Sequence, residues 1–581
     1  MMRDFLVGGL FATALLGVGC GPSSPAAAPR ASASTSAGAV DAPPTSSGAP
    51  LSPPVGDPFA LEGLIREEWL PLLSGPAPTF ADVAFPATPK NVPAPPPNEC
   101  TAWVTRGANV KAKRPSCGDK PAALDLLDKA MALAEPAARD EALALIESCE
   151  GFEAGVIRAL RIDLAPPECG DAMAEPLLVE KPGTPKPQGK RQIPGAVYHT
   201  LIGQALAARL LRTVQDPPKL DPPYTKDRVT TFTKGPLITW FKDQANAVEE
   251  LSKMSSELSY YGKGIAAIAS GTADLRLVEV VREAPIPDEF RSDPTALNDY
   301  YSNLDQALDA RKTRGMTAAL VGLKEMAHAG IISDGRTEIA RALVAKMYGG
   351  RRVDALDVLR RASPHPLGSG SMGARLAATL PTFFVGALLD PTYATDPAVL
   401  ENLRDRGVPT EFRVALKDAK LSDEATLHYA HARLRMGIRY WRAVDFDACA
   451  ALLTKIGHEK LAGEDLLDLA LALALRNGPD DVAILMAKAG AMPQDFGKIA
   501  ALDAVARDEK NGATRGFAAY DSAIIEQLRI PRTNDGDAWL AVAERYGAAI
   551  ALLSDEPLLR DAKSRKQAAE ATAKALKRGS E

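Results

Sequence analysis

The sequence predicts an all-α protein of stacked helical hairpins, an α-solenoid, behind a small N-terminal module that carries disulfides. From Gly195 onward, apolar residues recur every three or four positions, which is the spacing of one helix face. Short connections rich in Gly, Pro and Asn join these segments, and alternating strand patterns are scarce. Because a single helical hairpin cannot bury its apolar stripe alone, we expect consecutive hairpins to stack.

Residues 1–19 have the pattern of an export signal. Arg3 precedes an apolar run that is too short to span a bilayer, and small residues then lead to Cys20. This segment resembles the signal of bacterial lipoproteins that signal peptidase II cleaves. The resemblance implies a lipid on Cys20 and a cell-envelope location, with Gly21 favouring the outer membrane. An ordinary secretory signal cut nearby and an uncleaved anchor are the alternatives.

Residues 20–58 are predicted to form a disordered tether. After Cys20 they are almost entirely Ala, Pro, Ser, Thr and Gly, and Arg30, Asp41 and Asp57 are their only charged residues. Such a composition cannot bury enough apolar surface to offset the entropy lost on ordering. We therefore expect a flexible spacer between the membrane and the folded body.

Four cysteines mark residues 59–180 as a separate module: Cys100, Cys117, Cys149 and Cys169. They contain no C-x-x-C pair, which disfavours zinc, and they allow three disulfide pairings. The preferred pairs are Cys100–Cys117 and Cys149–Cys169, because both close short loops. Disulfides would indicate an oxidising compartment. Cys449 lies among Ala and Leu residues and is expected to be a buried, inert thiol.

The secondary structure of this module is predicted to be mixed. Residues 59–73 should form a short helix, and residues 101–106 and 108–113 a pair of strands. Residues 122–149 have the composition of two short Ala/Leu helices that are divided at Pro136.

Beyond a Lys/Pro linker at 181–194, the body divides into helical regions 195–415 and 416–581. The stretch 216–235 holds two Pro-Pro pairs and is predicted to be a surface loop, and 563–578 a solvated capping helix. The residues that define apolar helix faces include Val248, Leu251, Leu258, Ile339, Leu343, Met347, Val353, Leu356, Leu359, Trp539, Val542, Tyr546, Ile550 and Leu553.

Residues 434–461 carry a partial repeat pattern. Leu434, Gly437 and Tyr440 occupy small and aromatic positions of a first helix, and Cys449 fills a small-residue position of a second. The segment resembles a degenerate tetratricopeptide repeat. The resemblance implies two antiparallel helices that stack on their neighbours, a TPR-like superhelix.

Two motifs suggest chemistry, and each has a structural interpretation that we favour. Gly368 to Gly373 match G-x-G-x-x-G, but no buried strand precedes them, so a loop between helices is expected. His428 and His431, with Glu424 nearby, have metal-ligand spacing. However, His431 shares the apolar helix face, whereas His428 lies on the polar one. No cofactor or metal residue is therefore assigned.

An aromatic group is the remaining candidate. It can line a sugar or peptide groove, or fill gaps between stacked helices, which is commoner. Its members are Trp240, Tyr260, Tyr261, Tyr300 and Tyr301. No carboxylate pair stands out as a general acid and base, so no catalytic residue is assigned.

The formal net charge of −5 on 581 residues leaves no broad basic field for nucleic acid. The lipoprotein resemblance and the expected hairpin surface favour a membrane-tethered scaffold that binds envelope proteins or peptides. A lipoprotein that captures a nutrient or glycan is one alternative, which the aromatic content of 6% disfavours. An all-α envelope enzyme acting on polysaccharide is the other.

Overall fold

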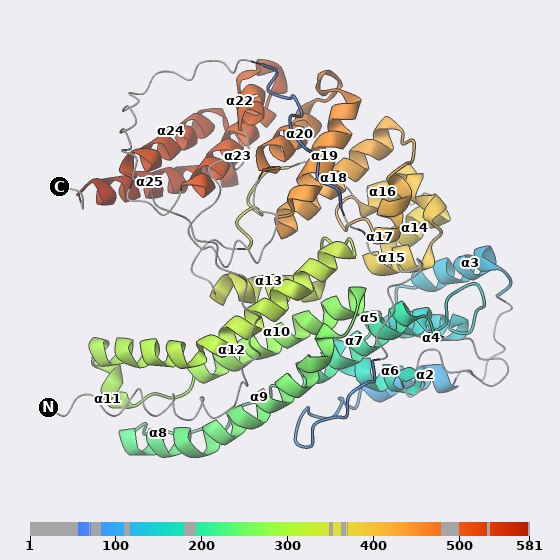
Figure 1. Cartoon of the computed structure of the whole chain (residues 1–581), viewed down its shortest axis with the longest axis vertical. Coiled ribbons are helices and arrows are strands. Elements are labelled where there is room, and N and C mark those ends of the chain that lie inside the picture. Colours follow the sequence, from blue (N-terminus) through green and yellow to red (C-terminus); the bar gives the residue numbers. More distant parts are fainter. Residues whose placement is uncertain are drawn as a thin grey trace, which may run out of the picture.

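The computed structural model describes residues 56–68, 70, 83–109, 117–178, 193–347, 353–361, 368, 370–477, 499–530 and 535–578. Throughout these residues the secondary structure is helical and contains no β-strand, which confirms the predicted all-α class. Many helices that follow one another in the chain pack as pairs. Figure 1 shows the long helices of the first half side by side, with the later helices arranged in an arc beside them.

The N-terminal module is a group of short helices. Proline lies in the first turn of two of them, where its missing N–H is not needed, and the predicted division at Pro136 is confirmed. Asp119 caps α3 by accepting a hydrogen bond from the amide of Ala122 at 3.2 Å. The helices are α2 (Cys100–Asn109), α3 (Lys120–Met131), α4 (Pro136–Ile146), α5 (Val156–Leu164) and α6 (Gly170–Leu178), with a 3-10 turn at Pro167–Cys169.

Two predictions for this module are wrong. Helix α2 (Cys100–Asn109) replaces the strand expected over 101–106 and the start of the one expected over 108–113, of which 110–113 lie outside the described residues. The part of the expected helix 59–73 that the structure describes, up to residue 68, has no regular secondary structure. Local sequence pattern misjudged both segments because contacts with distant helices decide their conformation.

The disulfide pairing also differs from the expected one. Cys100 pairs with Cys169, and Cys117 pairs with Cys149, closing separations of 69 and 32 residues. Helix α2 packs on α6 and on the turn before it, which brings Cys100 to a Cα–Cα distance of 5.2 Å from Cys169. Packing, and not loop length, therefore selects the partners.

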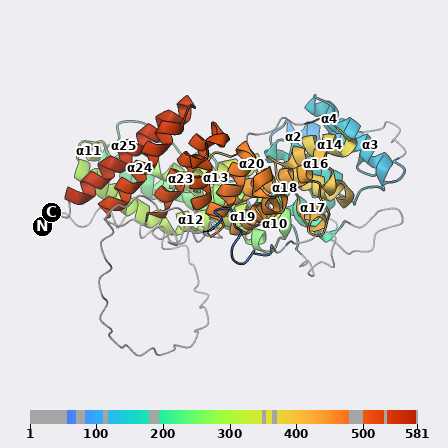
Figure 2. The same cartoon turned by 90° about the horizontal axis from the view of Figure 1, so that it is seen from above.

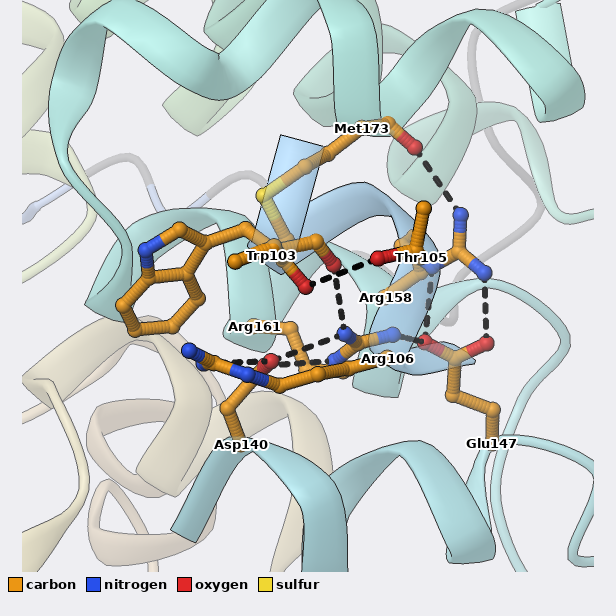
Figure 3. A network of polar contacts seen from close by, with 9 residues as sticks. Trp103, Thr105, Arg106, Asp140, Glu147, Arg158, Arg161 and Met173 are labelled. Atoms are coloured by element: carbon orange, nitrogen blue, oxygen red, sulfur yellow. Dashed lines mark hydrogen bonds and ion pairs between the residues drawn. The ribbon is translucent and has the colours of Figure 1, made fainter. Parts of the chain in front are cut away.

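A buried ion cluster joins three helices of the module. Figure 3 shows the Arg161 guanidinium between two carboxylates, at 2.7 Å from Asp140 and 2.5 Å from Glu147. It also donates to the Trp103 carbonyl of α2 at 3.1 Å, and Arg158 holds Glu147 from the other side at 2.7 Å. Burial raises the pKa of Glu147, but the hydrogen bond and charge of Arg158 and the charge of Arg161 outweigh it and lower that pKa overall.

The middle of the chain is built from long helices that approach one another closely. Side by side in Figure 1 lie α7 (Gly195–Leu211), α9 (Ile238–Ser252), α10 (Tyr260–Arg282) and α12 (Pro294–His328). Helices α7 and α10 cross at Gly203 and Gly262, where a Cβ on Gly262 would lie 2.1 Å from the His199 carbonyl oxygen. Smaller elements complete this part: α8 (Lys226–Phe232), α11 (Asp288–Arg291) and α13 (Gly335–Met347).

Replacing Gly262 by alanine should destabilise the protein. The new methyl group has no space at this crossing, so the two helices must separate, at a cost of about 1–3 kcal/mol. Urea denaturation of the two proteins measures the difference. Gly235→Ala is the matched control, because nothing lies within 4 Å of its Cβ position. Equal stability of Gly262→Ala and wild type would contradict the close crossing.

Other predictions for this part need correction. The stretch 216–235 is a loop only as far as Thr225, because α8 begins at Lys226 and a π-helical turn follows at Thr233–Leu237. Ile339 is 56% exposed, since the buried face of α13 carries Ala340 and Val344. Val353, Leu356 and Leu359 are buried, but the segment 353–359 consists of turns and forms no helix.

The C-terminal half begins with four helices of seven or eight residues, and the predicted hairpin, α18 with α19, follows them. Gly437 of α18 faces Phe446 of α19, with 2.5 Å between its Cβ position and the ring, and Cys449 is fully buried. The helices are α14 (Met372–Thr379), α15 (Thr382–Leu388), α16 (Pro397–Leu403), α17 (Thr410–Leu416), α18 (Asp423–Tyr440), α19 (Ala443–Ile456), α20 (Gly463–Leu475), α22 (Ala500–Arg507), α23 (Thr514–Arg529), α24 (Gly536–Leu552) and α25 (Glu556–Arg578).

The closing helix α25 has the position expected of a cap. It packs along α24, and its buried residues are Ala562, Ala569 and Ala573, while Lys563, Glu570 and Lys574 are exposed. Figure 2 places α24 and α25 at one end of the molecule and the N-terminal module at the other. The helical form predicted for 563–578 is confirmed.

Candidate functional site

A segment from the N-terminal part of the chain crosses the C-terminal hairpins, which are far from it in the sequence. Residues 56–68, which we call the strap, pass over α18, α19 and α20 as the blue trace in Figure 1. Phe59 stacks on His458 with ring centroids 4.9 Å apart, whereas Leu64 is 88% exposed and Ile65 45%. Phe59 and Leu61 are partly buried against the core, whereas the end of the strap, from Glu62 to Glu68, is held by polar contacts.

The carboxylate of Glu68 ends the strap among three arginines from separate elements. Arg413 of α17 bonds one oxygen, and Arg442, between α18 and α19, bonds the same oxygen at 2.5 Å. Arg433 of α18 lies 3.0 Å from the other oxygen. The buried Asp445 balances part of this charge, at 2.5 Å from Arg433 and 3.1 Å from Arg442. Only 8% of the Glu68 side chain is exposed.

The arginines control the ionisation of Glu68. Burial raises the pKa of this carboxyl group, but the charges of Arg433, Arg413 and Arg442 outweigh burial and hold the pKa well below its ordinary value. Glu68 is therefore ionised at neutral pH, and its ionised form favours the docked strap.

Docking of the strap should accordingly weaken in acid. Because the pKa of Glu68 is depressed in the docked state, the stabilisation is complete above the ordinary value of 4.5 and is lost as pH falls below it. Hydrogen exchange of the strap amides, corrected for intrinsic rates, should show less protection at pH 3.5 than at pH 6. Glu68→Gln should show no such change, and an equal pH response in both proteins would refute this origin.

The main chain of the strap is bound as well as its end. Arg476, at the end of α20, donates to the carbonyl oxygens of Glu62 and of Leu64, the latter at 3.1 Å. The backbone amide of Arg66 donates to the Asp447 carboxylate of α19 at 3.0 Å. The guanidinium of Arg66 donates to the carbonyl oxygen of Arg476 at 2.8 Å. Asp447 is fully buried and orients Arg476 at 2.8 Å.

These contacts hold both main-chain groups and one side chain of the strap. The bonded groups are the carbonyl oxygens of Glu62 and Leu64, the amide of Arg66 and the carboxylate of Glu68. Gly63 has a φ of 84°, so the chain bends between the two bonded carbonyls. We call the partner surface the strap-binding surface, and it is formed by Arg413, Arg433, Arg442, Asp447 and Arg476. Its chemistry is suited to holding a peptide, with a carboxylate at one end.

The structure places the glycine motif in a connection. Ser371 caps α14 by accepting from the amide of Ala374 at 3.3 Å, and the amide of Gly368 donates to Asn402 at 2.8 Å. The described residues that precede it, 353–361, are turns and not a strand. Residues 362–367, where the strand of a dinucleotide loop would lie, are outside the described residues.

The two histidines have different environments. His431 is 1% exposed and lies 2.8 Å from Asp468 and 3.0 Å from Asp465, so that it ties α18 to α20. Burial lowers the pKa of His431, but Asp468 and Asp465 outweigh it and raise that pKa overall, whereas burial lowers the pKa of His428. Among the residues that the structure describes, no group of three potential ligands could hold a metal ion.

The aromatic candidates do not form one floor. Tyr261 lies in the core, where its ring stacks on Phe383 at 4.1 Å and its hydroxyl donates to Asp163 at 3.0 Å. Tyr300 and Tyr301 pack edge to face on α12. Tyr261 therefore fills a gap between helices, which is the commoner of the two roles.

Sequence reasoning missed the strap-binding surface altogether. Its residues are scattered from 413 to 476, and the strap that they bind is more than 340 positions earlier, at a separation of 345 from Arg413 to Glu68. A usable signal existed in Arg433 and Asp445, charged residues in helices that are otherwise buried. Cys20 lies outside the described residues.

Comparison of the chain with protein-family models, with curated proteins and with solved structures finds no significant match. The structure thus defines a class, an all-α protein with two disulfides in its N-terminal part, which are typical of a protein that folds outside the cytoplasm. Within the described ranges, every helix is too short or too polar to cross a membrane.

Proposed function

We propose that the strap-binding surface binds extended peptide segments of other envelope proteins, and that a lipid on Cys20 holds the molecule at the outer membrane. The observation that carries the proposal is the docked strap itself. Residues 56–68 are bound through two carbonyl oxygens, one amide and one carboxylate, with little apolar burial at Leu64 and Ile65.

The same contacts suit a second peptide. Main-chain groups are common to all peptides, so Arg476 and Asp447 can bind an extended segment of another sequence. The three arginines add a preference for an acidic residue at the position of Glu68, since guanidinium groups bind carboxylates tightly. The strap is then an internal occupant that a partner must displace. The tetratricopeptide-like form of the α18–α19 hairpin belongs to this proposal.

A labelled peptide tests the binding function. We would add a fluorescent peptide with the sequence of residues 56–68 to full-length Glu68→Gln, whose own strap is weakened, and follow anisotropy. The peptide should bind this variant at least tenfold more tightly than it binds Glu67→Gln, whose substituted side chain is 88% exposed and leaves the strap docked. Equal binding to both variants would argue against a shared surface.

The membrane part has its own test. Cys20→Ala should leave the membrane fraction for the soluble fraction, and mass spectrometry of the wild-type protein should show acyl groups on an N-terminal Cys20. Retention of Cys20→Ala in the membrane fraction would overturn the lipid anchor without touching the peptide-binding proposal.

A further inference from the structure

A separate cavity lies on the other side of α18 from the strap. Its volume is about 730 Å³, within the range of small-molecule sites. Arg435 and Arg439 of α18 line it, and Tyr520 of α23 and Asp561 of α25 line it from across the cavity. The segment 353–361 closes a further side and contributes Arg360 and Arg361. These four parts of the chain thus meet around one space.

The charges in this cavity do not cancel locally. Each acidic residue that lines it has a cationic partner. The pairs are Asp357 with Arg341 at 2.9 Å, Asp405 with Arg435 at 2.5 Å, Glu338 with Arg439, and Asp561 with Arg565 at 2.5 Å. Among the described residues, no carboxylate lies within ion-pair distance of Arg360 or Arg361. The Arg361 guanidinium donates one hydrogen bond, to the Leu359 carbonyl oxygen at 3.3 Å, and its remaining N–H groups and those of Arg360 can bind a ligand.

The environment of Arg360 also favours a bound anion. Its Cζ lies 5.0 Å from the centroid of the Phe517 ring, and its buried Nε has no hydrogen-bond partner in the part of the chain that the structure describes. Its backbone amide donates to Asp521 at 2.8 Å. Burial raises the pKa of Asp521 well above its ordinary value, so this carboxyl group opposes the two charges less than an ionised one would.

We propose that this cavity binds a small organic anion, with its carboxylate or phosphate on Arg360 and Arg361 and an apolar group against Leu359 and Leu558. Planar guanidinium groups pair with either kind of oxyanion through two parallel hydrogen bonds. Val358, Leu359, Ile438 and Leu558 supply apolar lining beside the arginines. The site is independent of the strap-binding surface and goes beyond peptide binding.

Calorimetric titration of the full-length protein tests the site with phenyl phosphate, benzoate, inorganic phosphate and benzyl alcohol. Phenyl phosphate or benzoate should bind with a submillimolar dissociation constant, and the stronger of the two identifies the preferred oxyanion. Benzyl alcohol should bind at least tenfold more weakly, and so should inorganic phosphate. Equal binding of benzyl alcohol would overturn the role of charge, and equal binding of inorganic phosphate would overturn the apolar contact.

Variants locate the ligand. Arg360→Gln with Arg361→Gln should weaken binding at least tenfold, whereas Arg276→Gln, at an exposed position of α10, should leave it unchanged. If the double variant does not fold, arginine modification by phenylglyoxal decides the matter in the wild type. Phenyl phosphate should protect Arg360 and Arg361 and leave Arg276 reactive. Unprotected Arg360 and Arg361 at saturating ligand would refute the site.

Discussion

Glu68→Gln should release the strap. The substitution keeps the size of the side chain but removes the charge that Arg413, Arg433 and Arg442 share, and breaking a buried ion pair from one side costs about 3–5 kcal/mol. A loss of about 3 kcal/mol makes the docked state open roughly a hundredfold more often. Hydrogen exchange at the Arg66 amide, which donates to Asp447 when the strap is docked, should accelerate by that factor.

Glu67→Gln provides the matched control for this experiment. Its carboxylate is one position away and 88% exposed, and it lies 3.9 Å from Lys417, so its loss should change the opening free energy by less than about 1 kcal/mol. Slow exchange at Arg66 in both variants would mean that the arginine cluster does not hold the strap.

Arg161→Met should destabilise the disulfide module by a similar amount. Methionine fills much of the volume of the Arg161 side chain but cannot pair with Asp140. Asp140, whose side chain is 2% exposed, then keeps only its longer contact with Arg106, at 3.3 Å. Loss of one partner from a buried ion cluster costs about 3–5 kcal/mol. Hydrogen exchange of the α5 amides in the oxidised protein measures the loss, and protection should fall at least a hundredfold.

Lys129→Met tests whether the loss of any ion pair in the module would lower its stability as much as Arg161→Met does. Lys129 and Asp125 pair on the exposed face of α3, with 69% and 57% of their side chains exposed, so the change should cost less than about 1 kcal/mol. Unchanged α5 protection in Arg161→Met would show that the cluster contributes no stability.

The positions of helices could be predicted where a nearby proline or glycine, or the spacing of apolar residues, determines the local conformation. Helix α7 begins at Gly195 as expected. Pro136 is the first residue of α4, and Pro381 is the residue that caps the start of α15. These features depend on the chain within one or two turns, which is the range over which sequence pattern is informative.

The candidate site could not be predicted, because it depends on contacts between distant residues. Residues 59–68 of the strap were expected to be helical, yet Arg476 and Asp447 bind the main chain there and thereby satisfy groups that a helix would pair internally. The cysteine pairs and the exposed Ile339 have the same cause, since packing between helices decides which residues meet and which face is buried.

Photocrosslinking with a peptide tests peptide binding most directly. A peptide of residues 56–68 that carries benzoylphenylalanine at the position of Phe59 would be irradiated with full-length Glu68→Gln and mapped by mass spectrometry. Phe59 stacks on His458 in the docked strap, so crosslinks should concentrate around His458, between α19 and α20. Crosslinks spread over other helices, or none above those of a scrambled peptide, would contradict binding at the strap-binding surface.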